Sequence, residues 1–258
     1  PSPPLTPSGG LRGLHLTRIT SVSHLASLPP EFLTGDPRRP LLHVDEAGHE
    51  YRYYLDPMRK AVFFILLVEM LERFSFYGIN YTTTAYLTGQ YNEDWNADMP
   101  SVTASSYVSI STAVAYTTPF LGAFLADQFL GEYLTMIVAT LLCYIPGLAL
   151  IALTSVPGFL GPRFNVTAIR LGLLVLWPMG TGAVKACVNV FGAKQFHPVL
   201  QSSLIESYYV NFYMCINIGA LTGGIVVPIV AQRNVSVAYS IPVCMLGAGV
   251  LLFVSGTS

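Results

Sequence analysis

The stretch Glu69-Met-Leu-Glu-Arg-Phe-Ser-Phe-Tyr-Gly78 places three ionisable side chains inside a long apolar run. The eight residues before it, Ala-Val-Phe-Phe-Ile-Leu-Leu-Val, carry no charge, and the segment continues to Leu87. Each ionisable side chain at the centre of a membrane helix costs roughly 2.5–3.5 kcal/mol. A helix that keeps three of them must pair them or use them to line a wet cavity. The stretch therefore predicts a membrane helix with one charged face turned away from lipid.

That face can be read from the helical period. At about 100° per residue, one side of the helix carries Glu69, Glu72, Arg73, Phe76 and Asn80. Ionisable groups inside membrane helices are usually functional, because keeping them there is costly. The alternative is a structural ion pair that only joins two spans. We therefore take this face as a candidate functional site.

Composition supports a membrane protein. The chain has 258 residues, of which 52% are hydrophobic and only 10% charged, whereas a soluble domain has about 25% charged residues. The formal net charge of −1 gives no indication of a nucleic-acid partner. The four cysteines show no C-x-x-C spacing, and we interpret them as small apolar core residues.

Six apolar segments are each long enough to cross about 30 Å of hydrocarbon. We place them near residues 60–88, 102–126, 132–154, 166–191, 204–231 and 237–256. Residues 56–258 are thus predicted to form an all-α bundle of six transmembrane helices. Residues 1–55 are rich in proline and arginine, and we expect a mostly disordered cytoplasmic tail there.

The charges beside the first predicted span indicate its orientation. Three cations precede this span, and the loop after it has three carboxylates but no Lys or Arg. The cations are Arg52, Arg59 and Lys60, and the carboxylates are Glu93, Asp94 and Asp98. Because cytoplasmic flanks are enriched in Lys and Arg, the N-terminus is predicted to be cytoplasmic.

Several segments resemble one family of transporters. The opening stretch is similar to E-x-x-E-R-F-x-Y-Y-G in the first span of the proton-coupled oligopeptide transporters, with Phe76 in place of the usual Tyr. Residues 122–131 match that family's G-x-x-x-A-D-x-x-x-G signature. Residues 180–186 resemble its G-T-G-x-x-K-P, with Ala186 in place of Pro. Residues 212–221 resemble its F-Y-x-x-I-N-x-G-S-L, with Ala220 in place of Ser, and residues 191–196 its F-G-x-D-Q-F, with Lys194 in place of Asp.

The resemblance implies the major facilitator fold, with twelve spans in two six-span halves and the substrate held between them near the middle of the membrane. The present chain would be the N-terminal half, and its partner would be the C-terminal half of the same transporter. The resemblance further implies proton-coupled symport of di- and tripeptides by alternating access, with no enzymatic activity and no cofactor. The membrane would be the plasma membrane or the vacuolar or lysosomal membrane.

The resemblance and the charged face together give the candidate site. For proton coupling they nominate Glu69, Glu72, Arg73 and Lys185. For substrate binding they nominate Arg73, Phe76, Tyr77, Asn80, Tyr116, Lys185 and Asn217. For a structural turn and gate they nominate Gly122, Asp127 and Gly131, with Asp127 placed to cap the following helix. Tyr116 and Asn217 also fit plain packing or an interhelical hydrogen bond.

Physical chemistry suggests how the charges work. A deprotonated Glu69 or Glu72 would hold Arg73 and Lys185 in ion pairs. Protonating the carboxylate would free a cation to take an anionic group, such as the C-terminal carboxylate of a peptide. Arg73 suits bidentate carboxylate recognition, whereas Lys185 is a point charge.

Other functions stay open at this point. Phe76 and Asn80 stand where many peptide transporters of the family have Tyr and Arg, which favours a changed ligand such as histidine, nitrate or another small anion. A membrane sensor could bind a peptide without moving it. A membrane metalloenzyme fits worst, because all five histidines lie outside the predicted spans.

Overall fold

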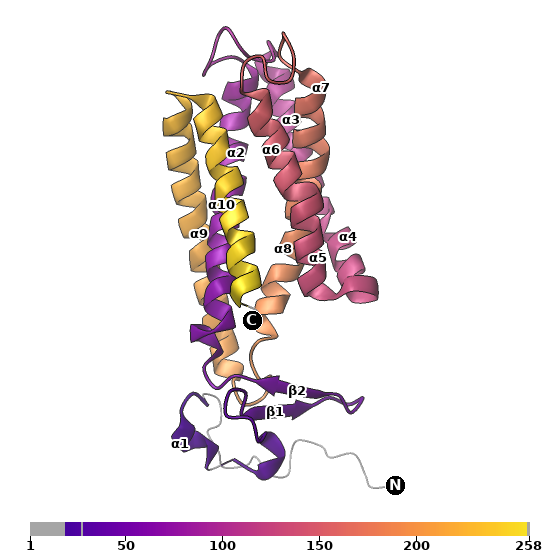
Figure 1. Cartoon of the computed structure of the whole chain (residues 1–258), viewed down its shortest axis with the longest axis vertical. Coiled ribbons are helices and arrows are strands. Elements are labelled where there is room, and N and C mark those ends of the chain that lie inside the picture. Colours follow the sequence, from indigo (N-terminus) through magenta and orange to yellow (C-terminus); the bar gives the residue numbers. More distant parts are fainter. Residues whose placement is uncertain (1–18, 27, 257–258) are drawn as a thin grey trace. The chain divides into compact units, whose positions relative to one another are not determined.

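The computed structural model describes residues 19–26 and 28–256 (Figure 1). The chain divides into two compact units, which we call the small unit and the bundle. The small unit is Pro1–Phe63 with Gly192–Val210, and the bundle is Phe64–Phe191 with Asn211–Ser258. The small unit therefore joins the region before the first predicted span to the loop between the fourth and fifth.

The small unit is built around a β-hairpin. It contains α1 (Val22–Leu25), 3₁₀ turns at Pro30–Phe32 and Pro57–Arg59, β1 (Leu41–Val44) and β2 (Glu50–Tyr53). The two strands are antiparallel, with Leu41 opposite Tyr53 and Val44 opposite Glu50. The Asp45 carboxylate closes the hairpin loop by accepting hydrogen bonds from the backbone N–H groups of Ala47 and His49.

The expectation of a disordered tail does not hold for the described part of residues 1–55. Leu41 is fully buried and packs with Leu28 and Leu200, the last of which precedes α9. The Gln201 side chain donates to the backbone oxygens of Tyr54 and Leu55. These contacts satisfy backbone groups that a disordered tail would leave to water. Residues 1–18 of the predicted tail lie outside the described residues.

The bundle and the helices that enter it follow the six predicted segments. The first segment is α2 (Ala61–Leu87). The second comprises α3 (Ser101–Thr117), α4 (Pro119–Leu125) and a π-helical turn at Ala126–Leu130, and the third α5 (Gly131–Ala139), a π-helical turn at Thr140–Tyr144 and α6 (Ile145–Thr154). The fourth comprises α7 (Val166–Arg170), a π-helical turn at Leu171–Leu176 and α8 (Trp177–Ala193). The last two are α9 (Ser202–Ala231) and α10 (Val235–Gly256).

Four continuous helical stretches of the described chain are long and apolar enough to cross a membrane: Ser101–Thr154, Val166–Ala193, Ser202–Ala231 and Val235–Gly256. The first, of 54 residues, contains both the second and the third predicted span. Helix α2 is not among them, because its most apolar part contains three charged residues, Glu69, Glu72 and Arg73. These stretches support an integral membrane protein, and the count of six crossings stays a prediction.

In the turn signature of residues 122–131, both terminal glycines have a defined structural role, whereas Asp127 does not have the capping role expected for it. Gly131 has φ of 72°, a left-handed conformation that suits glycine and separates the preceding π-helical turn from α5. A Cβ on Gly122 would lie 2.6 Å from Ala183 Cα, so this glycine lets α4 contact α8. The expected capping by Asp127 is wrong: the N-cap position of α5 is Leu130, without a side-chain cap, and Asp127 is exposed.

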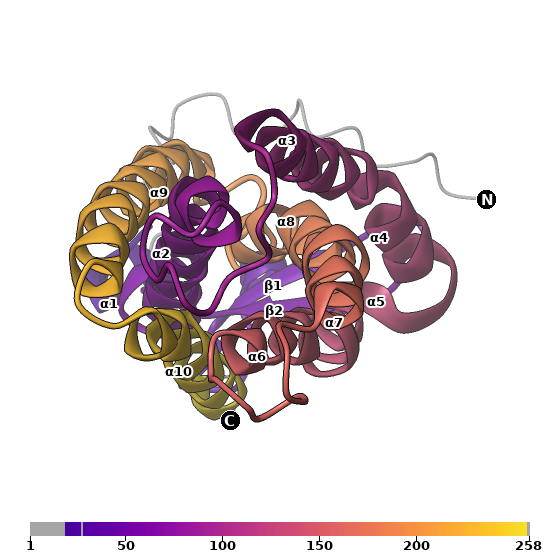
Figure 2. The same cartoon turned by 90° about the horizontal axis from the view of Figure 1, so that it is seen from above.

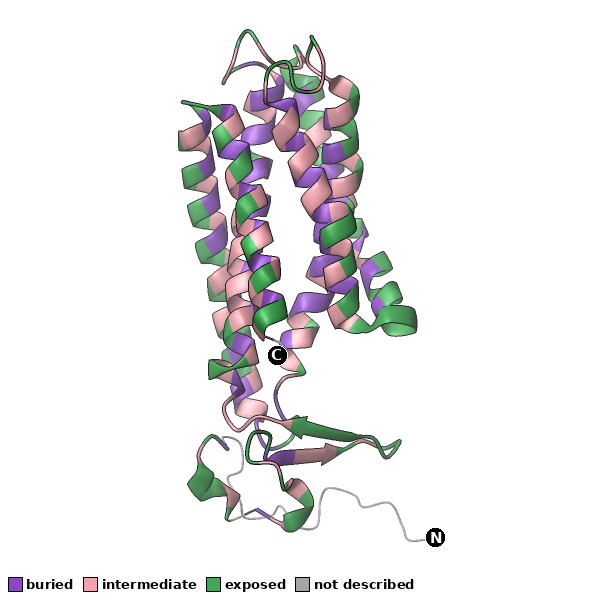
Figure 3. Ribbon diagram, viewed as in Figure 1, coloured by how far each residue is buried: buried purple, intermediate pink, exposed green. Residues whose placement is uncertain are grey.

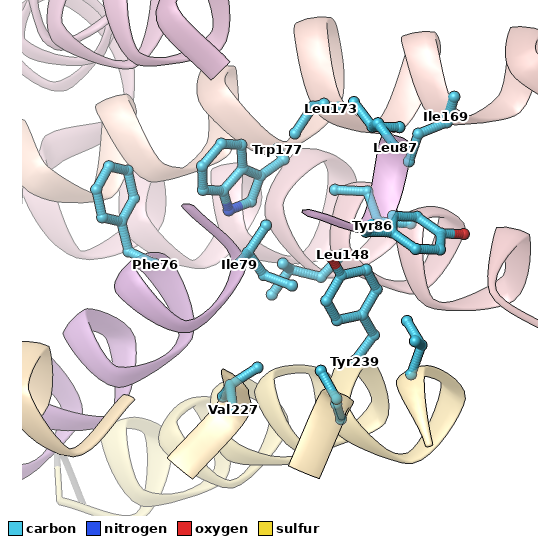
Figure 4. Close-up of a cluster of buried hydrophobic side chains, with 14 of the residues drawn as sticks. Phe76, Ile79, Tyr86, Leu87, Leu148, Ile169, Leu173, Trp177, Val227 and Tyr239 are labelled. Carbon is cyan, nitrogen blue, oxygen red and sulfur yellow. The ribbon is translucent and has the colours of Figure 1, made fainter. Parts of the chain in front are cut away.

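Helix α2 packs in the middle of the bundle. Figures 1 and 2 show it beside α9 and α10. Its packing on α9 depends on glycine, because Cβ atoms on Gly219 and Gly223 would collide with the backbone of Met70 and Phe74. Small residues of this kind let membrane helices approach closely. Towards the other helices, α2 contributes Phe76, Ile79 and Tyr86 to the buried cluster drawn in Figure 4.

The outer surface of the bundle is apolar. Figure 3 shows exposed residues along the outward faces of α9 and α4. They include large apolar side chains, namely Phe120, Leu121, Phe124, Val210, Tyr213, Met214, Leu221, Ile225 and Ile229. Charged side chains are meanwhile buried on α2. Apolar outside and charged inside is the arrangement expected of helices surrounded by lipid.

Candidate functional site

Arg73 bridges two buried carboxylates of its own helix. Its Nε lies 3.1 Å from Glu69 Oε1, and its Nη2 forms an ion pair with Glu72 Oε2. The three residues are 3%, 2% and 1% exposed respectively. Arginine can form two separate ion pairs because its guanidinium carries five donors in a planar fork. The charged face predicted from the sequence is therefore one internally paired cluster.

Two hydroxyl groups from other helices complete the cluster. Tyr144, in the π-helical turn before α6, and Thr181, in α8, each donate a hydrogen bond of 2.7 Å to Glu72 Oε1. Glu72 is thus held from three helical segments. Glu69 Oε2, in contrast, has no hydrogen-bond partner among the described residues. The two carboxylates are therefore inequivalent, because both oxygens of Glu72 are engaged, whereas Glu69 Oε2 takes no part in the ion pair with Arg73.

The G-T-G sequence explains how the two hydroxyl groups converge. A Cβ on Gly180 would collide with the backbone of Tyr144, so glycine lets α8 lie directly against the third helical segment. Two residues further, a Cβ on Gly182 would lie 3.0 Å from the carbonyl oxygen of Ala115 in α3. Thr181 stands between the two glycines and reaches Glu72. Neither Thr181 nor Tyr144 was predicted from the sequence as a site residue, although Thr181 lies within the G-T-G motif.

Lys185 sits apart from the ion pairs. Its Nζ lies 3.8 Å from the centre of the Tyr116 ring, which is a cation–π contact. Its charge still acts on Glu69. The ion pair expected between Lys185 and a carboxylate is absent within 4.0 Å in the described part of the chain. Tyr116 and Lys185, nominated separately from the sequence, are brought together.

The other nominated residues of α2 have defined partners. Phe76 is buried and stacks on Trp177, with ring centres 5.2 Å apart. The Arg73 guanidinium carbon lies 5.3 Å from the centre of the Phe76 ring. Asn80 donates a hydrogen bond of 3.1 Å to Thr112 of α3. Phe76 therefore supports Arg73, and Asn80 joins α2 to α3.

Tyr77 and Asn217 differ in their surroundings. The Tyr77 ring contacts the rings of Phe76 and Tyr81 and is half-buried. Asn217 is exposed, and its side chain donates to the Tyr213 carbonyl of its own helix at 2.8 Å. Asn217 thus lies outside the charged cluster, and within the described residues its side chain bonds its own helix rather than another one.

A small cavity of about 30 Å³ borders Glu72. Its lining comes from α2, α5, α8 and α10 and from the π-helical turn at Thr140. Most of that lining is apolar, with Glu72 and Thr140 as its polar members. A volume of this size has room for a water molecule. Glu72 therefore faces open space on one side and hydroxyl donors on the other.

The sequence profile of the POT family matches residues 134–258. The chain is therefore similar to members of the POT family. Among curated relatives, Peptide transporter family 1 of Drosophila melanogaster is 32% identical over 210 residues, which cover 78% of this chain and 27% of the relative. Protein NRT1/PTR FAMILY 8.2 of Arabidopsis thaliana is 38% identical over 174 residues, which cover 63% of this chain and 29% of the relative.

The fold of the POT family is also shared. The crystal structure of the POT family transporter PepTSo matches with a TM-score of 0.66 and 26% identity, over 76% of this chain and 37% of that one. By their names, the Drosophila relative and PepTSo are transporters. The chain spans less than a third of the length of either curated relative.

Proposed function

We propose that the protein to which this chain belongs is a proton-coupled symporter of di- and tripeptides that works by alternating access. The observation that supports this proposal is the bridging of Arg73 to two buried carboxylates. A buried cation held by two groups that can each take a proton is a site where proton binding and anion binding compete for one guanidinium.

The proposed coupling begins with proton uptake. A proton on Glu69, whose Oε2 is unpartnered, or on Glu72 removes one of the two negative charges that hold Arg73. The guanidinium then offers two parallel N–H donors to the C-terminal carboxylate of a peptide. Lys185, held on the Tyr116 ring rather than in an ion pair, supplies a second cation.

The remaining elements of the proposal follow from the family. The proposed substrate-binding residues are Arg73, Phe76, Tyr77, Asn80, Tyr116, Lys185 and Asn217. The proposed gate turn contains Gly122, Asp127 and Gly131. The C-terminal half of the same transporter supplies the opposite wall in a twelve-span arrangement. We place the protein in the plasma membrane or the vacuolar or lysosomal membrane, with a cytoplasmic N-terminus.

Transport of another small solute, such as histidine, nitrate or another anion, is the second candidate. Asn80 is engaged with Thr112 and Phe76 is stacked on Trp177, so neither offers the cation or hydroxyl that many peptide transporters of the family have there. A peptide sensor that does not transport is the third candidate, because it would need the same binding groups without a proton path.

Uptake by the full-length protein in proteoliposomes tests the proposal. With an inward pH gradient, the wild type should accumulate labelled dipeptide, and Glu72→Gln should abolish this uptake while leaving peptide counterflow. Glu93→Gln, in the loop after α2, is the matched control and should behave as wild type. Normal pH-driven uptake by Glu72→Gln would contradict the mechanism. Dipeptide binding without any uptake by the wild type would favour the sensor, and uptake of nitrate or histidine alone would favour the second candidate.

A further inference from the structure

The small unit contains a cavity that the proposed transport function does not use. It has a volume of about 400 Å³ and lies along β2 and the two residues that follow α8. Cavities of 300–1,000 Å³ are typical of ligand sites. Three cations line this one, Arg39, Arg52 and Lys194, against a single carboxylate, Glu50. The cavity is therefore suited to an anion.

The arginines are arranged so that their charge stays available. The Arg39 guanidinium lies 4.8 Å from the centre of the Tyr54 ring and donates a hydrogen bond of 3.2 Å to the Tyr54 hydroxyl. Neither contact neutralises it. Arg52 and Glu50 approach only to 3.9 Å, and both are more than half exposed. An ion pair so exposed is weak, because water screens it.

Lys194 changes the charge of this cavity relative to the family pattern. The F-G-x-D-Q-F motif, matched here by residues 191–196, has Asp where this chain has Lys194. With Asp, two cations would face two carboxylates. With Lys, three cations face one carboxylate. This single departure turns a balanced lining into one with a net charge of about +2, which can hold an anion with several negative charges.

The chain connects this cavity directly to the ends of two helices that are predicted to cross the membrane. Lys194 directly follows Ala193, the last residue of α8, and Tyr54 precedes the start of α2 at Ala61 by seven residues. Seven residues reach at most about 25 Å. Basic groups next to the ends of membrane helices favour anionic lipids. We propose that this cavity binds the phosphorylated head group of a membrane lipid.

Arginine and lysine would bind a phosphate group in different ways. The two arginines offer planar pairs of N–H donors to phosphate oxygens, and Lys194 adds a point charge. Bound lipid would tie the hairpin and the α8–α9 loop to the membrane surface. The lining shares no residue with the charged cluster on α2, so failure of the lipid proposal would leave the transport proposal intact.

Binding of a fluorescent phosphatidylinositol bisphosphate to the full-length protein in phosphatidylcholine nanodiscs tests the proposal. Lys194→Asp, which installs the residue of the family motif on an exposed loop, should weaken binding roughly tenfold or more, since it reverses one charge. Arg39→Gln should weaken it by several-fold. Arg163→Ala, an exposed cation in the α6–α7 loop, should bind as wild type. Unchanged melting temperatures would show that the variants are folded.

Competition distinguishes the source of the phosphate. Soluble inositol trisphosphate should displace the lipid only at much higher concentration, because it lacks the acyl chains that hold the head group at the surface. Equal affinity for inositol trisphosphate would overturn the lipid assignment in favour of a soluble phosphorylated ligand. Equal binding by Lys194→Asp and wild type, or equal weakening by Arg163→Ala, would overturn the site itself.

Discussion

Tyr144 donates a hydrogen bond of 2.7 Å from its hydroxyl group to Oε1 of Glu72, which joins the third helical segment to the charged face of α2. The donor stands in a π-helical turn, where the backbone deviates from the regular α-helix. Such turns are frequent at functional sites. A change in the charge of Glu72 therefore alters a hydrogen bond to a helical segment other than α2.

The first prediction concerns this hydroxyl group. Tyr144→Phe keeps the ring but removes one of the two hydroxyl donors to Glu72. A hydrogen bond to a charged group contributes about 1.5–3 kcal/mol, so proton-driven uptake by the full-length protein should fall on the order of tenfold or more, with an altered pH profile. Initial rates of dipeptide uptake over a range of external pH measure this.

The control for that variant is another buried tyrosine. Tyr239→Phe removes a buried hydroxyl group from α10 whose polar neighbours are the hydroxyl groups of Thr82 and Thr83 and not a carboxylate. Its uptake and pH profile should match the wild type. If Tyr144→Phe also matched the wild type in both rate and pH profile, Tyr144 would be a packing residue without a role in coupling.

The second prediction tests the shape of the Arg73 side chain. Arg73→Lys keeps the positive charge, but one ammonium group cannot reach Glu69 and Glu72 in the way that Nε and Nη2 of one guanidinium do. Substrate affinity, measured by inhibition of labelled dipeptide uptake or binding, should fall about tenfold or more. Lys185→Arg is the comparison, because a point charge on an aromatic ring tolerates a guanidinium. Unchanged affinity in Arg73→Lys would contradict the bidentate role.

The charged face of α2 was predictable because it depends on local spacing. Glu69, Glu72 and Arg73 lie within one helical turn and a half, so their shared face follows from the period of the helix alone. The high cost of charge in lipid then makes their pairing expected. The structure has both features, and the apolar helical segments also lie where the sequence places them.

Partners from other helices were not predictable in the same way. Tyr144 stands in an apolar run, where one tyrosine looks like a packing residue. The contact of Lys185 with Tyr116 depends on how α3 and α8 cross. The available signal was the pair of glycines around Thr181, since close approach of two helices at Gly180 implies that the residue beside it faces a neighbour.

The hairpin was missed for a related reason. Local composition of residues 28–55 is polar and rich in arginine, which favours disorder. The stabilising contacts come from residues far along the chain, since Leu200 covers Leu41 and Gln201 binds the backbone at Tyr54 and Leu55. Contacts of such long sequence separation leave no periodic pattern within the segment.

The third prediction concerns the packing of α9 on α2. A Cβ on Gly223 would lie 2.8 Å from the backbone carbonyl carbon of Phe74, and backbone cannot move aside cheaply. Gly223→Ala should therefore lower the thermal stability of the purified protein, by about 1–3 kcal/mol if the helices must separate. Gly247→Ala is the matched control, because no atom lies within 4 Å of its added Cβ. That variant should be neutral or slightly more stable. Equal melting temperatures for the two variants would contradict the close contact.

The fourth prediction concerns His197, between α8 and α9. Its Nδ1 accepts hydrogen bonds from the backbone N–H groups of Val199 and Leu200, at 3.2 and 3.1 Å, and its Nε2 donates to the Leu42 carbonyl oxygen at 3.1 Å. Burial lowers the pKa of His197 to about 4, although the Leu42 carbonyl acts in the opposite direction. The rings of His43 and Tyr53 face it at 5.3 and 5.4 Å, and the charge of His43 lowers its pKa further.

A histidine with a lowered pKa in the folded state makes the small unit sensitive to acid. Between about pH 6.5 and pH 4 the unfolded form binds the proton and the folded form does not, so stability is complete above this window and falls as the pH drops through it. Hydrogen exchange of the β1 and β2 amides, corrected for intrinsic rates, should therefore show less protection at pH 5 than at pH 7. His197→Asn keeps a side-chain acceptor for the two backbone N–H groups but does not titrate, and it should show equal protection at both pH values. The same loss of protection in His197→Asn would assign the acid sensitivity to another group.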